Sequence, residues 1–120
     1  MRLRTLLRDE SGGATVLACF ALAALVVVTA ALVHLGGVVV SRHRAQAAAD
    51  LAALAAAYAL DGGSESACAA ASSITDRMGV ELADCSVDGW QVVVSTTASA
   101  GSGLLPIGPA CAVARAGPVE

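Results

Sequence analysis

The stretch "ATVLACFALAALVVVTAALVHLGGVVV", residues 14–40, decides the fold. These 27 residues include no Asp, Glu, Lys or Arg, and His34 is their one basic side chain. A helix needs about 20 apolar residues to cross the hydrocarbon core of a bilayer, whereas a cleavable secretory signal has an apolar region of about 7–15. A chain of 120 residues is also too short to wrap this run in a soluble core. We therefore predict a transmembrane helix over residues 14–40.

Arginines flank this segment, and most of the acidic residues follow it. Arg2, Arg4 and Arg8 precede the apolar run, whereas Arg42 and Arg44 follow it. This difference predicts a cytoplasmic N-terminus and an extracytoplasmic C-terminal domain. The chain has no lysine and a net charge of −3, so it lacks the basic patch typical of nucleic-acid binding.

The segment "SRHRAQAAADLAALAAAYAL", residues 41–60, is rich in alanine and free of Gly and Pro. High helix propensity predicts that the membrane helix continues as a rod until "DGG" at 61–63 ends it. Within the rod, one apolar stripe with the spacing i, i+4, i+7 and i+11 is the candidate packing face for other helices. Its residues are Ala47, Leu51, Leu54 and Tyr58.

A second short helix and a β-hairpin are predicted beyond the rod. Ser64 is the expected N-cap of the helix, and Gly79 is expected to end it. Asp88-Gly89 lies between two β-prone runs and predicts a two-residue hairpin turn that pairs Val87 with Trp90. Residues 99–120 are rich in Gly, Pro and Ala and are predicted to be a flexible tail with one further short strand at 110–115.

Three of the four cysteines belong to the C-terminal half. The predicted helix and hairpin direct Cys68 and Cys85 to one interface, which makes them the candidate disulfide. Cys111 is left over, so a Cys85–Cys111 bond, an intermolecular bond and free thiols stay open as alternatives. Cys19, inside the apolar run, is interpreted as a small buried residue.

The sequence carries no sign of catalysis or metal binding. The motifs GxSxG, HExxH, GxGxxG and the P-loop are all absent, and no CxxC occurs. No histidine lies beyond His43 to serve as a base or as a further metal ligand in the C-terminal half. We therefore expect a protein that is not an enzyme and that has no cofactor, metal ion or small-molecule substrate.

Two segments together carry a family resemblance. "DESGGATVLACFALAALVVV" followed by "RHRAQAAADLAALAAA" resembles the small TadE/TadG-like proteins of Flp (Tad) pilus assembly. The similarity is closest to an actinobacterial branch found near secretion-type pilus genes and a helicase gene. The resemblance implies a pseudopilin-like membrane protein whose N-terminal helix contacts other pilin-like or Tad secretion subunits.

The same resemblance implies processing by a prepilin peptidase after Gly12 or Gly13. Pilin-like sequences have a glutamate a few residues into the apolar run, and this chain has Leu17 there. Cleavage and entry into a filament therefore stay open.

The predicted fold is α+β and membrane-anchored. It comprises a leader (1–13), a transmembrane helix (14–40), a helical extension (41–61), an exported helix with a β-hairpin (62–98) and a tail (99–120). The alternative is a secreted or surface-anchored, disulfide-stapled interaction protein unrelated to pili.

Overall fold

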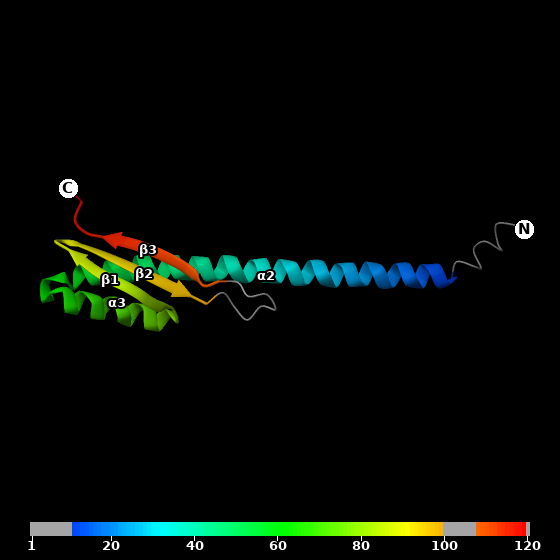
Figure 1. Ribbon diagram of the computed structural model, residues 1–120, viewed down its shortest axis with the longest axis horizontal. Coiled ribbons are helices and arrows are strands. Elements are labelled where there is room, and N and C mark those ends of the chain that lie inside the picture. Colours follow the sequence, from blue (N-terminus) through cyan, green and yellow to red (C-terminus); the bar gives the residue numbers. More distant parts are fainter. Residues whose placement is uncertain (1–10, 100–107, 120) are drawn as a thin grey trace, which may run out of the picture. The chain divides into compact units, whose positions relative to one another are not determined.

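The computed structural model describes residues 11–99 and 108–119 (Figure 1). A long apolar helix, a second shorter helix and a small antiparallel sheet confirm the predicted α+β architecture. The elements in chain order are α2 (Ser11–Tyr58), the 3-10 helix η1 (Leu60–Gly62), α3 (Ser64–Met78), β1 (Glu81–Asp88), β2 (Gln91–Ala98) and β3 (Ala110–Ala116). The chain divides after Leu35 into two units, which are described separately.

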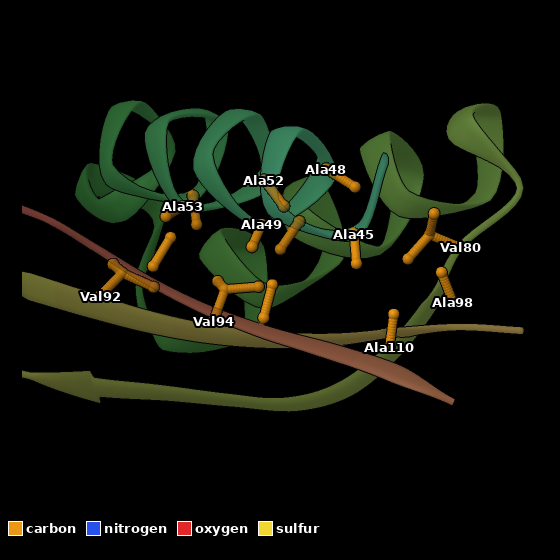
Figure 2. Close-up of a cluster of buried hydrophobic side chains, with 14 of the residues drawn as sticks. Ala45, Ala48, Ala49, Ala52, Ala53, Val80, Val92, Val94, Ala98 and Ala110 are labelled. Carbon is orange, nitrogen blue, oxygen red and sulfur yellow. The ribbon is translucent and has the colours of Figure 1, made fainter. Parts of the chain in front are cut away.

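In the unit that begins at Gly36, helices cover one face of a three-stranded sheet with the strand order β1-β2-β3 (Figure 2). The C-terminal part of α2 and the whole of α3 form this helical layer, and η1 joins them. The core lies between the two layers. Its strand side comes mainly from Val92 and Val94 of β2, and its helical side comes mainly from alanines.

The face that α2 turns to the sheet consists of six alanines, each at most 1% exposed. They are Ala45, Ala48, Ala49, Ala52, Ala53 and Ala56. Their spacing of three and four residues places them on one side of a helix. Because alanine side chains are short, the helix backbone approaches the sheet closely. The hydroxyl of Thr96 in β2 consequently donates a buried hydrogen bond of 2.8 Å to the carbonyl oxygen of Ala45.

The start of α3 differs from the sequence prediction. Gly63 is the N-cap, and Ser64 is the first helical residue. Gly63 has φ 95° and ψ 174°, a backbone region that is open essentially only to glycine. The chain makes its sharp change of direction at Gly63, so Ser64 already has helical geometry. The predicted end of this helix is confirmed, because Gly79 closes it in the left-handed conformation.

The predicted hairpin is present, but its predicted register is wrong. Asp88 pairs with Gln91, and Val87 pairs with Val92, so Gly89 and Trp90 form the turn. Gly89 has φ 61°, and no described non-glycine residue has a positive φ. This pattern, with a positive φ at the first turn residue alone, is typical of a type II′ turn. The sequence interpretation assumed that Asp88 and Gly89 occupy the turn, which is the usual preference of the type I′ turn.

The further strand predicted at 110–115 is confirmed as β3, which pairs antiparallel with β2. This part of the predicted flexible tail is therefore a strand of the sheet. Ala110, Ala112 and Ala114 turn inward, and Cys111, Val113 and Arg115 turn outward. Residues 100–107 of the predicted tail and most of the predicted leader lie outside the described residues.

Candidate functional site

The apolar part of α2 is exposed around its circumference. Thirteen large apolar side chains between Val16 and Val40 are each more than half exposed. Among the described residues, α2 is the one helix that is long and apolar enough to cross a membrane. The mean hydropathy of its most apolar window is 2.9. A helix that is apolar on every side needs apolar surroundings. The described residues therefore include one candidate membrane span, in the region that the sequence predicts.

Hydroxyl groups in and beside this segment find partners within the helix itself. The Thr29 hydroxyl donates to the carbonyl oxygen of Leu25 at 2.8 Å, and the Ser41 hydroxyl donates to that of Gly37 at 2.7 Å. Such bonds to the carbonyl four residues earlier satisfy a hydroxyl where water is absent. Thr29 and Ser41 are thus compatible with hydrocarbon surroundings.

Nε2 of His34 is buried and has no hydrogen-bond partner among the described residues.

Basic residues follow the apolar run directly. Arg42, His43 and Arg44 are exposed on α2 just beyond Val40. Cationic side chains at this boundary are typical of the interface between lipid and water. The arginines that precede the run lie outside the described residues.

Gly12 and Gly13, the candidate cleavage positions, lie in the first turn of α2. Both are exposed, and an added Cβ at either would meet no atom within 4 Å. The first four N–H groups of a helix have no partner within it, so this turn is among the easiest parts of the helix to unwind. Both positions are therefore sterically accessible from outside the helix.

The predicted packing stripe lies on the side of α2 opposite the alanine face. At 100° per residue, its four positions point away from the sheet. Ala47 is half-buried, and Leu51, Leu54 and Tyr58 are exposed. The stripe thus takes no part in the core of its own unit and is open to a partner. The sequence interpretation missed the alanine face because it gave weight to large side chains; the three- and four-residue spacing of the alanines was the signal that could have revealed it.

The predicted disulfide between Cys68 and Cys85 is present and joins α3 to β1. The two Cα atoms are 5.9 Å apart, within the usual range for a disulfide. Cys85 lies in the edge strand β1, opposite Val94 of the central strand β2. The bond therefore holds α3 against β1 at the edge of the core. Cys19 and Cys111 are free, and both are exposed. Cys19 is thus not buried within the chain, contrary to the sequence interpretation.

No group of three or more His, Cys, Asp or Glu side chains in the part of the chain that the structure describes is placed to hold a metal ion. Two surfaces of the described residues are exposed: the apolar part of α2, and the stripe of Leu51, Leu54 and Tyr58 in the disulfide-stapled unit.

Comparison with known proteins adds two findings. Residues 12–59 match the Tad family model, described as Flp pilus-assembly TadE/G-like. Over 54 residues the chain is 56% identical to a protein of Mycobacterium tuberculosis named Apoptosis inhibitor Rv3654c. That match covers 45% of this chain and 64% of the relative, which is less than two thirds of its length. No solved structure matches the chain.

Proposed function

We propose that the chain is a non-enzymatic, pseudopilin-like membrane component of a Flp/Tad-type pilus assembly or secretion system. The match of residues 12–59 to the TadE/G-like family model supports this proposal. The observation that carries the proposal is the coincidence of two ranges. The family match at 12–59 covers both the exposed apolar helix and the alanine-faced extension that packs on the sheet. The family segment is thus the part that anchors the protein and supports its domain.

The proposed topology is single-pass, with the N-terminus in the cytoplasm and the stapled domain outside. The excess of arginine before the apolar run supports this direction. The Cys68–Cys85 bond supports it independently, since structural disulfides persist in oxidising compartments.

The proposed partners are other pilin-like or Tad secretion subunits, which would contact the N-terminal helix. Without a hydrophobic driving force in lipid, helices associate through close van der Waals packing and small residues. The apolar run supplies alanines and glycines for such packing. The exposed stripe at Leu51, Leu54 and Tyr58 would extend the contact beyond the membrane.

Topology can be tested with the free thiol of Cys111, which is exposed on β3. Intact cells are treated with a membrane-impermeant maleimide, and Cys111→Ala is the matched control because it leaves Cys19 as the other free thiol. We expect labelling of the parent protein in intact cells and none of the variant. Labelling of Cys111 only after lysis would overturn the proposed topology.

Processing and function are tested separately. N-terminal sequencing of the membrane-extracted protein distinguishes a start at Gly13 or Ala14, which supports cleavage, from an intact Met1, which supports a plain anchor. Deletion of the gene is expected to abolish piliation or Tad-type secretion, with restoration by the gene supplied in trans. Normal piliation and secretion after deletion would count against the proposed function whatever the N-terminus.

The second candidate is a secreted or surface-anchored interaction protein that is unrelated to pili. The mycobacterial relative is named an apoptosis inhibitor, and this name does not refer to pili. The disulfide-stapled domain is the observation that favours it for this chain. This candidate predicts that the protein accumulates in the medium and that its N-terminus lies near residues 30–40. Complete retention in the membrane fraction would contradict it.

A further inference from the structure

A pocket of about 820 Å³ lies in the second unit, at the point where the apolar run ends. One wall is a flank of α2, and the other is formed by residues 108–112, at and before the start of β3. The volume lies within the range of about 300–1,000 Å³ that is usual for pockets that hold small ligands. The α2 residues that line the pocket are Val38, Val39, Arg42, His43 and Gln46.

The helical wall of this pocket changes from apolar to cationic within about one turn. Val38 and Arg42 are four residues apart, as are Val39 and His43, so each pair lies on one face of the helix with a rise of about 6 Å between its members. The two valines belong to the apolar run at 14–40, and the two polar residues follow it directly. When the apolar run lies in a membrane, the pocket therefore crosses the boundary between hydrocarbon and headgroups.

Arg42 and His43 are exposed, and their N–H groups are open to a ligand. Within 11–99 and 108–119, neither side chain has a hydrogen-bond or ion-pair partner. Histidine keeps an N–H donor in both of its protonation states, and a guanidinium binds phosphate through two parallel hydrogen bonds. The donors of this pocket therefore match a phosphate group.

The charge around the pocket favours an anion over a zwitterion. None of the described residues that line the pocket carries a carboxylate. Asp50 is the one acidic residue of α2; it accepts a hydrogen bond of 3.0 Å from Nε2 of Gln46. It lies about 12 Å beyond Arg42 along the helix. A zwitterionic headgroup would thus place its ammonium beside Arg42 with no lining carboxylate to pair with it.

We propose that this pocket binds an anionic phospholipid. Arg42 and His43 donate hydrogen bonds to the phosphate oxygens, and an acyl chain lies against Val38 and Val39. A phospholipid changes from apolar to anionic in the same direction as the pocket wall, whereas a soluble phosphate compound would leave the two valines in water. The proposal rests on the proposed membrane span and does not depend on a role in pilus assembly.

Native mass spectrometry of the full chain in a neutral detergent counts the lipids that stay bound. The chain is titrated with phosphatidylglycerol and, separately, with phosphatidylcholine that has the same acyl chains. We expect the first phosphatidylglycerol to bind at least about tenfold more tightly, because its phosphate keeps a net charge for Arg42. Equal binding of the two lipids would overturn the proposal.

Glycerol phosphate, which has the anion without acyl chains, separates the lipid from a soluble ligand. It is expected to bind at least about tenfold more weakly than phosphatidylglycerol, because it leaves the valines uncovered. Equal binding of glycerol phosphate would assign the pocket to a soluble phosphate compound and overturn the assignment to a lipid.

Arg44 supplies a matched control. It lies at the same boundary as Arg42, but two steps of about 100° each turn it to the opposite flank of α2. There it lines a different pocket together with Ser41 and Gly79. Arg42→Gln is expected to reduce the preference for phosphatidylglycerol to less than about threefold, and Arg44→Gln is expected to leave it unchanged. Both arginines are exposed, so both variants are expected to keep the fold, which unchanged Trp90 emission would verify.

A preference that survives Arg42→Gln would overturn the proposal. Equal losses in the two variants would mean a general attraction between basic residues and anionic lipid, and would overturn the pocket as its cause. Incorporation of the parent chain into nanodiscs of phosphatidylcholine alone tests the membrane span separately. A chain that enters these discs but shows no lipid preference refutes the pocket, and a chain that stays outside them refutes the span on which the pocket rests.

Discussion

Removal of the Cys68–Cys85 bond is expected to lower the free energy of unfolding of the second unit by about 3 kcal/mol. The two cysteines are 17 residues apart. A cross-link that closes a loop of this size lowers the conformational entropy of the unfolded chain, which is worth about 3 kcal/mol of stability. The loss corresponds to roughly a 150-fold rise in the unfolding equilibrium constant. The core consists mostly of alanine and valine side chains, so a large part of the unit's stability depends on this bond.

The measurement is a urea titration of the protein in detergent micelles, followed by the emission of Trp90. The variant combines Cys68→Ala with Cys85→Ala. With a slope of about 1 kcal/mol per molar urea for a unit this small, the midpoint is expected to fall by about 3 M. Cys111→Ala, which removes an exposed free thiol, is the control and is expected to change the free energy by less than about 0.5 kcal/mol.

A loss below about 1 kcal/mol with an unchanged slope would refute this reasoning. It would mean that the unfolded chain is already restricted around these cysteines without the bond, so that loop closure is not the source of stability. A larger loss together with a changed slope would point instead to a rearranged native unit.

Three further changes can be measured by the same titration. Ala52→Leu should destabilise the unit by about 1–3 kcal/mol, because three carbon atoms enter a site with no exposed surface. Leu51→Ala, on the opposite side of the helix, should cost less than about 0.5 kcal/mol. The reverse order of these two losses would show that the stripe, not the alanine face, packs on the sheet. Thr96→Val removes the hydrogen bond to the carbonyl of Ala45 and should cost about 1 kcal/mol, and no change would mean that this bond adds nothing to helix–sheet packing. Gly63→Ala should cost about 1–3 kcal/mol since its backbone region is disfavoured for residues with a Cβ, and a neutral result would show that the helix entry tolerates another geometry.

The features that the sequence predicts correctly are those that depend on one strong physical requirement. The length of the apolar run at 14–40 is enough to identify the candidate span. Helical and strand periodicity direct Cys68 and Cys85 to one interface, and the bond is present. The further short strand predicted at 110–115 is likewise present as β3.

The features that the sequence does not predict depend on competition between similar local choices. Asp88-Gly89 and Gly89-Trp90 can each form a two-residue turn, and the register of the whole sheet decides between them. The sequence interpretation assigned Trp90 to a strand, so it did not predict that Trp90 and Tyr58 line the same pocket. Alanine supplies helix propensity on every side of α2, so composition alone did not show which side faces the sheet.

The alanine face also constrains how this protein can change over evolutionary time. Glycine aside, every substitution of a buried alanine adds atoms where no space exists, and glycine weakens the helix by about 1 kcal/mol. Few substitutions are therefore tolerated on the inner side of α2. On the outer side, exposed residues such as Leu51 and Leu54 can vary without loss of the fold. Copies of such a domain would diverge in what they contact while they keep the same fold, so that one scaffold could serve a succession of different partners.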